Sequence, residues 1–308
     1  MLIIEFLKTV WSWFFYEKRE HDTSTDPHNK RPKSENLCFR TFLNRPEVEE
    51  VIATDCQPLW RINIWNRQVF FSGDDKCIKR IDQTLQTCKY EVASLSGNSP
   101  DDFAIEKSGE IVYADWQERT VCRLTNGAVE TIINIGAWKP WALCCTVAGD
   151  ILVAMRSRDM KHARVVGYKG SQKTREYRLD NNGHPLYASP IFIVENNNQD
   201  VCVSDADYNR VTVVDQNGRF KFHYNGRQVS TLYPTFYPKG LATDSQCNIL
   251  VADQQNNCIH ILDRVGQLVS FIADSSLDEP YCLCVGSEDE LFVGEYHQGK
   301  IKKLKYLQ

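Results

Sequence analysis

The sequence predicts an all-β fold, a six-bladed β-propeller preceded by a short N-terminal extension. A proline recurs six times at intervals of 42, 40, 50, 48 and 42 residues, and in four units an acid follows fifteen residues after the proline. Repeat periods of about 40 to 50 residues are typical of propeller blades and of some helical repeats. The apolar runs inside each unit are four to six residues long and rich in β-branched and aromatic residues, which favours strands over helices.

Each unit contains an inner strand that starts at the proline, a second strand that ends at the acid, a polar turn, a third strand, a hairpin and an outer strand. This is the composition of a four-stranded blade. The blades begin near Pro58, Pro100, Pro140, Pro190, Pro238 and Pro280. The first and third units depart from the pattern, because Gly73 and Met155 stand where the others have an acid.

The recurring acid has a local structural explanation. An aspartate that ends a strand accepts hydrogen bonds from backbone amides one or two residues later and so redirects the chain. Four residues after the acid the units carry asparagine or glycine, which tolerate the left-handed conformation, with Arg119 as the exception. We therefore assign these positions to turns: Asp115, Asp205, Asn209, Asp253, Asn257, Glu295 and Gly299.

The ends of the chain suggest how the ring closes. The sixth unit is one strand short, and residues 47–54 read as an unpaired strand that can supply its outer strand. The propeller then spans 38–308.

Residues 1–37 read as an apolar stub followed by a flexible, charged linker. The stub is interrupted by Glu5 and Lys8 and is too short for a stable membrane span.

Composition and motifs narrow the function. A net charge of −4 gives no general attraction to nucleic acid, and no DNA partner is expected. The twelve cysteines form no C-x-x-C pair and no N-x-S/T acceptor is present, so we expect free thiols and a cytoplasmic location. Common catalytic signatures are absent and the histidines are scattered. The sequence therefore predicts that the chain is not an enzyme and has no cofactor or metal.

Two motifs resemble a known family. V-S-D-x-x-x-N-R-V at 203–211 and V-A-D-x-x-N-N-C-I-H-I-L-D-x-x-G at 251–266 resemble NHL repeats, and the ending LFVGEYHQGKIKKLKYLQ resembles the last blade of invertebrate, particularly molluscan, tripartite-motif proteins. The resemblance implies a six-bladed propeller that selects a protein for ubiquitin transfer or binds RNA. This sequence carries no Cys/His pattern for the RING or B-box, so ligase activity would require a longer form or a partner.

The candidate binding surface lies where connections from different units meet. The connections that carry the prolines and those that follow the acids emerge on one face of a propeller, and the longest of the latter is MRSRDMKHARV in the third unit. Its basic residues suit phosphates or acidic groups, and nearby aromatic residues offer stacking surfaces. The candidate residues are Arg156, Arg158, Lys161, His162, Arg164, Arg119, Arg210, Tyr208, Trp116, Trp138 and Lys139.

Three functions remain from different classes. A protein-binding module is the leading interpretation because the chain is acidic overall and has only one basic loop. RNA binding through the same face is the first alternative. The second is a calcium-dependent lactonase or esterase that would use acids near the inner strands, namely Asp101, Asp102, Glu195 and Asp244. The identity of the partner and the oligomeric state stay open.

Overall fold

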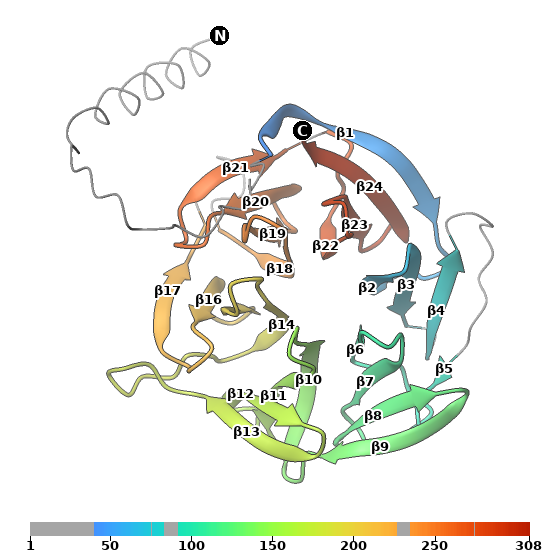
Figure 1. The fold of residues 1–308 in the computed structure, drawn as a ribbon, viewed down its shortest axis with the longest axis vertical. Coiled ribbons are helices and arrows are strands. Elements are labelled where there is room, and N and C mark those ends of the chain that lie inside the picture. Colours follow the sequence, from blue (N-terminus) through green and yellow to red (C-terminus); the bar gives the residue numbers. More distant parts are fainter. Residues whose placement is uncertain (1–39, 75, 83–91, 227–234, 274) are drawn as a thin grey trace, which may run out of the picture. The chain divides into compact units, whose positions relative to one another are not determined.

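The fold is a ring of six β-sheets around a central axis (Figure 1). We describe it from a computed structural model that covers residues 40–74, 76–82, 92–226, 235–273 and 275–308. Residues 40–308 form one compact unit, and each sheet contains four antiparallel strands. The predicted six-bladed propeller is confirmed. The predicted stub and linker at 1–37 lie outside the described residues.

The strands are given blade by blade, from the inner strand to the outer strand. Blades one to three contain β2 (Leu59–Trp65), β3 (Gln68–Gly73), β4 (Cys77–Asp82) and β5 (Val92–Ala93); β6 (Asp102–Ile105), β7 (Ile111–Asp115), β8 (Thr120–Thr125) and β9 (Ala128–Asn134); and β10 (Trp138–Cys145), β11 (Ile151–Ser157), β12 (Ala163–Lys169) and β13 (Gln172–Tyr177). Blades four to six contain β14 (Pro190–Glu195), β15 (Val201–Asp205), β16 (Arg210–Val214) and β17 (Phe220–Tyr224); β18 (Pro238–Thr243), β19 (Ile249–Asp253), β20 (Cys258–Leu262) and β21 (Leu268–Ile272); and β22 (Pro280–Val285), β23 (Leu291–Glu295), β24 (Lys300–Leu307) and β1 (Phe42–Ala53).

The core lies between the blades, where the apolar faces of neighbouring sheets meet. The second strands β7, β15, β19 and β23 are buried at every position, because a blade covers each of their faces. Side chains are small where blades approach most closely. At Gly294 in blade six, for example, a Cβ atom would lie 2.9 Å from Cδ2 of Leu59 in blade one.

The ring closes through a strand from the start of the described chain. β1 pairs antiparallel with β24, with Ile52 opposite Ile301, so the sixth blade combines residues from both ends of the sequence (Figure 1). Backbone hydrogen bonds between Thr41 and Gln308 extend this pairing. Closure removes the open edge that β24 would otherwise present.

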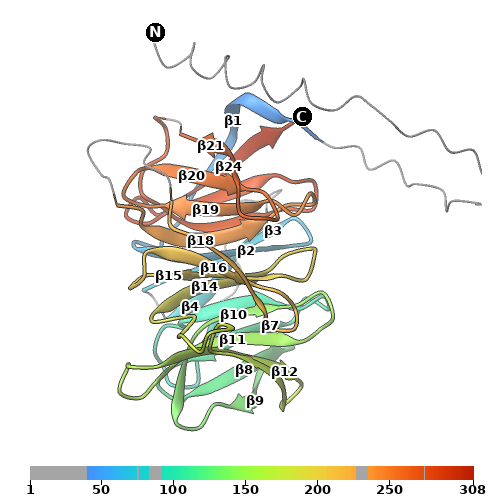
Figure 2. The same ribbon diagram turned by 90° about the vertical axis from the view of Figure 1, so that its left-hand side faces the viewer.

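The two faces of the ring carry different connections. We call upper the face on which inner strands begin and second strands end, as in the pairs Pro190 with Asp205 and Pro280 with Glu295. A view turned by 90° shows the blades edge-on, following one another around the ring (Figure 2). The described part of the chain contains no helix that is both long and apolar enough to cross a bilayer.

Candidate functional site

The recurrent acids tie two connections of the upper face together. Asp205 accepts hydrogen bonds from the amides of Ala188 (2.7 Å) and Ser189 (3.0 Å) before the inner strand, and from the amide of Tyr208 (3.0 Å) in the turn. Asp115 does the same with the amides of Ser96 and Glu118. The acid therefore fixes the incoming connection as well as its own turn.

The turn residues share one backbone conformation. Asn209, Asn257, Gly299 and the exception Arg119 have φ between 48° and 60°. The two units without an acid differ for steric and chemical reasons. At Gly73 a Cβ atom would lie 2.4 Å from the carbonyl oxygen of Pro58 and 2.8 Å from Cys56 Cβ, in the segment that joins β1 to β2. Buried Met155 accepts a hydrogen bond from Arg164 on its sulfur.

Two of the five basic residues in the blade-three connection are engaged within the chain. Arg156 donates to Ser189 Oγ (3.0 Å) and to the carbonyl oxygen of Met160 (2.9 Å), which joins blade three to the start of blade four. Arg164 lies 3.9 Å above the ring of Trp138 and pairs with Glu176 at 3.3 Å. The other three basic residues of this connection are exposed, as is the acid Asp159 between them: Arg158, Lys161 and His162.

Four of the predicted residues surround one pocket of about 220 Å³ between blades two and three. Its lining consists of Trp116, Gln117, Arg119, Lys139 and Arg158. The Lys139 ammonium lies 4.2 Å from the ring centre of Trp116, and the Trp116 ring packs against Trp141 at 5.6 Å. None of the three cations has a carboxylate partner among the described residues. The pocket therefore offers positive charge beside an aromatic plane.

The remaining two predicted residues lie on blade four. Arg210 donates to the carbonyl oxygen of Leu186 (3.0 Å) and stacks on Tyr208 at 4.2 Å. Partial burial lowers the pKa of the guanidinium, although Asp205 opposes this shift. Arg210 therefore supports the fold, while Tyr208, at 41% exposure, presents its ring to solvent.

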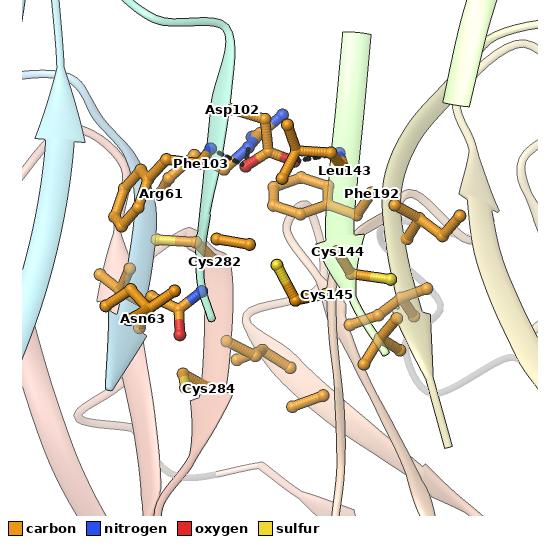
Figure 3. A pocket seen from close by; sticks show the side chains of 18 of the residues that line it. Arg61, Asn63, Asp102, Phe103, Leu143, Cys144, Cys145, Phe192, Cys282 and Cys284 are labelled. Carbon is orange, nitrogen blue, oxygen red and sulfur yellow. Dashed lines mark hydrogen bonds and ion pairs between the residues drawn. The ribbon is translucent and has the colours of Figure 1, made fainter. Parts of the chain in front are cut away.

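An internal cavity of about 250 Å³ lies along the central axis and is lined by inner strands of all six blades. At one end, buried Arg61 pairs with Asp102 at 2.9 Å and donates to the carbonyl oxygen of Ile191, and Asp102 also accepts the amide of Leu143 (Figure 3). This network links blades one to four. The cavity also contains four thiols, and burial raises the pKa of each: Cys144, Cys145, Cys282 and Cys284.

The acids named for a calcium-dependent enzyme are held by separate partners. Asp101 accepts the amide of Trp116, Glu195 accepts the amide of Val147, and Asp244 accepts Asn248 and the hydroxyl of Tyr306. Among the described residues, the three potential ligand residues that do come together are in blade five and include none of these acids. The geometry therefore gives no support to a calcium site on the axis.

Lys239 is a buried polar residue that was not among the residues predicted from the sequence. The ladder between β18 and β19 skips Lys239 and Gly240, and the Lys239 ammonium lies 4.1 Å from the ring centre of Tyr237 and 5.6 Å from that of Tyr281. Burial, aided by the charge of Arg61, lowers the pKa of Lys239 to about 8. The sequence signal was available, because Lys239 directly follows the landmark proline of its unit and is the only basic residue at that position. The other five units carry Leu59, Asp101, Trp141, Ile191 and Tyr281.

We expect Lys239→Met to raise the free energy of unfolding at pH 7 by about 2 kcal/mol, because it removes a buried positive charge. One pKa unit corresponds to about 1.4 kcal/mol, and solvent screens part of the shift in the pKa of Lys239. A lysine whose pKa falls from 10.5 to about 8 on folding destabilises the fold fully below pH 8, and this cost disappears towards pH 10.5. Urea unfolding at pH 7 and at pH 10 tests whether the gain in stability of the Met variant is larger at the lower pH. Lys239→Arg, which keeps the charge, should show no such pH-dependent gain, and a Met variant with equal gain at both pH values would contradict the shift.

Comparisons with known proteins support the fold. No family model and no curated protein matches the chain. Similar solved structures include a streptogramin B lyase (TM-score 0.60, 13% identity, 85% of this chain and 98% of that chain) and regucalcin, a calcium-binding protein from Agrobacterium tumefaciens (0.63, 10%, 82% and 92%). A structure of the nidogen/laminin complex is also similar (0.57, 15%, 73% and 84%). These likenesses show a six-bladed propeller, whereas membership of the NHL tripartite-motif family is not confirmed.

The comparisons correct one prediction. The prediction that the chain is not an enzyme rested on the absence of catalytic signatures. This prediction is wrong, because a streptogramin B lyase has the same fold over 98% of its length. Local motifs are a poor guide to propellers, whose sites combine residues from several blades. At 13% identity the similarity to the lyase shows a shared fold, and it assigns no particular reaction to this chain.

Proposed function

We propose that the upper face around blades two and three binds a protein partner through an acidic segment. The observation that carries the proposal is the pocket formed by Trp116, Arg119, Lys139 and Arg158. Its three cations lack carboxylate partners among the described residues, so a partner's carboxylates can pair with them without breaking an existing ion pair. Arginine and lysine next to an aromatic ring also suit an acidic side chain that packs its methylene groups against the ring.

A protein fits this surface better than RNA does. RNA platforms combine a broad positive groove with several aromatic rings, whereas here Arg156, Arg164 and Arg210 are engaged within the chain and the net charge is −4. The similar nidogen structure is a complex with laminin, which supports protein recognition by this fold.

The cellular setting is part of the proposal. The described cysteines are free thiols, a state typical of the reducing cytoplasm, and we place the interaction there. The resemblance to NHL repeats suggests that the bound protein is selected for ubiquitin transfer, with the ligase activity supplied by another domain or partner.

The test is a crosslinked pull-down with the full chain as bait, performed with and without nuclease. The test variant reverses the three pocket charges, Arg119→Glu, Lys139→Glu and Arg158→Glu. The matched control reverses three exposed charges in lower-face hairpins, Lys169→Glu, Arg219→Glu and Arg264→Glu, so both variants have the same net charge. We expect at least a tenfold loss of captured protein for the pocket variant and little change for the control, because each lost charged contact costs about 1–3 kcal/mol.

Two outcomes would reject the proposal. If nuclease releases the captured material, and binding falls steeply with salt, the face binds RNA instead. If the pocket variant and the lower-face variant capture the same proteins as the unmodified chain, the pocket is not the binding surface.

A further inference from the structure

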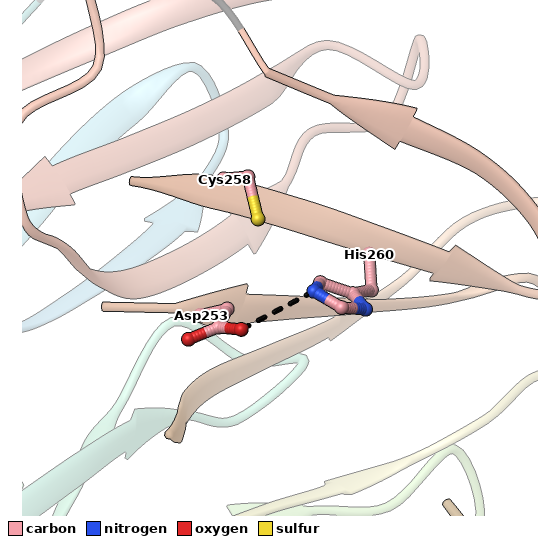
Figure 4. A group of neighbouring side chains, drawn as sticks. All are labelled: Asp253, Cys258 and His260. Atoms are coloured by element: carbon pink, nitrogen blue, oxygen red, sulfur yellow. Dashed lines mark ion pairs between the residues drawn. The ribbon is translucent and has the colours of Figure 1, made fainter. Parts of the chain in front are cut away.

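Three potential metal ligands meet in blade five, away from the pocket described above. Asp253 ends β19 and is paired with Cys258, which begins β20, and His260 lies two residues further on the same side of β20 (Figure 4). One ligand atom from each residue lies within 4.8 Å of the others. All three residues are buried, with exposed fractions of 0–1%.

The group contains polar atoms that the fold leaves without partners. The His260 ring is fixed by a 2.7 Å hydrogen bond between Nδ1 and the Tyr224 hydroxyl, but Nε2 has no hydrogen bond although it is fully buried. The Cys258 thiol has no partner among the described residues. A buried polar atom without a hydrogen bond costs about 1–3 kcal/mol, so a nitrogen without a hydrogen bond, beside a thiol and a carboxylate, indicates a missing ligand.

The spacing and the chemistry of the group fit zinc. His260 Nε2 lies 3.3 Å from Asp253 Oδ2 without making a hydrogen bond to it, and two ligands about 2.0 Å from a tetrahedral zinc ion are about 3.3 Å apart. A nitrogen, sulfur and oxygen set suits zinc rather than calcium or magnesium, which prefer oxygen alone. The charges of a thiolate and a carboxylate would also balance the ion in this apolar surrounding.

The surroundings support such a site. The rings of Tyr224, Phe236 and Phe271 pack around His260 at centre distances of 4.9–5.7 Å, which excludes water and fixes the ring. The Tyr224 hydroxyl on Nδ1 is the kind of outer partner that orients metal-binding histidines. Asn256 in the same turn donates to Asp253 Oδ2 at 2.8 Å and so holds the carboxylate in place.

We propose that Asp253, Cys258 and His260 bind a zinc ion that fastens the upper end of blade five. The sequence predicted no metal and placed Asp253 in a turn, a role that the residue also keeps, since it accepts the amide of Tyr237 at 3.2 Å.

Blade six shows what the same positions look like when no metal is needed. The residues equivalent to Asp253, Cys258 and His260 are Glu295, Lys300 and Lys302 in the strand register, and the Lys302 ammonium lies 2.6 Å from Glu295 Oε1. A permanent cation neutralises the buried acid there. His260→Lys would therefore reproduce the blade-six pair in blade five and remove a zinc ligand without leaving the carboxylate unpaired.

The experiment titrates the chelator-treated full chain with Co²⁺ and then with Zn²⁺. We expect one Co²⁺ per chain, with a thiolate-to-cobalt absorption band and tetrahedral visible bands that Zn²⁺ abolishes. His260→Lys should fold, as judged by circular dichroism, and bind Co²⁺ at least a hundredfold more weakly. Cys258→Ala should lose the thiolate band, and the control Cys202→Ala, which removes a buried thiol from blade four, should keep it.

The outcomes are decisive. Absence of the cobalt bands in the unmodified chain, or a thiolate band that persists in Cys258→Ala, would overturn the proposal. A folded His260→Lys variant that binds Co²⁺ as tightly as the unmodified chain would do the same. None of these readouts depends on the binding partner of the upper face.

Discussion

Replacing Asp102 by alanine is expected to lower the free energy of unfolding by about 3–5 kcal/mol, the usual cost of breaking a buried ion pair from one side. Asp102 accepts hydrogen bonds from Arg61 Nε (2.9 Å) and from the amide of Leu143 (2.9 Å), so one carboxylate connects three blades. In the variant the buried guanidinium loses its counter-charge and the amide loses its acceptor. Urea unfolding, followed by tryptophan fluorescence and circular dichroism, measures the change.

Two further variants separate the effect of the buried ion pair from a non-specific loss of stability. Arg61→Met combined with Asp102→Leu removes both charges and should recover much of the loss, since apolar replacements of a buried pair are often neutral. Glu288→Ala breaks the exposed pair with Arg67, whose side chains are 82% and 66% exposed, and should cost less than about 1 kcal/mol. Equal losses for the buried and exposed pairs would show that the network does not hold the ring together.

The sequence predicted those parts of the fold that are repeated. Pro190 and Asp205 stand opposite each other in the strand ladder, and the same pairing recurs in blades five and six, so one physical requirement produces one spacing. The exceptions follow from contacts that exist in one blade alone. A side chain at Gly73 would meet Cys56, whose Cβ atom lies 2.8 Å from the Cβ position of Gly73, in the segment that joins β1 of the sixth blade to β2 of the first.

The position of the candidate site could be predicted from the sequence, but not which of its basic residues are free to bind a partner. The blade-three connection and its neighbours do form one pocket, but Arg156 and Arg164 have partners, Ser189 and Glu176, from segments whose distance in space no spacing reveals. The group formed by Asp253, Cys258 and His260 in blade five could have been predicted more directly. Once Asp253 is placed at the end of a strand, pairing places Cys258 opposite it, and alternation puts His260 on the same face.

Gly240→Ala is expected to destabilise the propeller by about 3 kcal/mol, at the upper end of the usual cost of overpacking a core. A Cβ atom at Gly240 would lie 2.7 Å from the amide nitrogen of Leu283 and from the carbonyl oxygen of Tyr281, both on the neighbouring inner strand β22. Backbone atoms cannot rotate away as a side chain can. Blades five and six must therefore move apart, and because β1 closes the sixth blade, that movement strains the whole ring.

Gly286→Ala provides the matched control at the lower end of β22. Its Cβ would lie 2.7 Å from Glu290 Oε2, the tip of a flexible side chain that can turn aside. Both variants lose the same backbone freedom in the unfolded chain, so the difference between their unfolding free energies isolates the backbone contact. We expect Gly286→Ala to stay within about 0.5 kcal/mol of the unmodified chain. If Gly240→Ala is equally well tolerated, the inner strands of blades five and six do not meet backbone to backbone, and the small residue there has another cause.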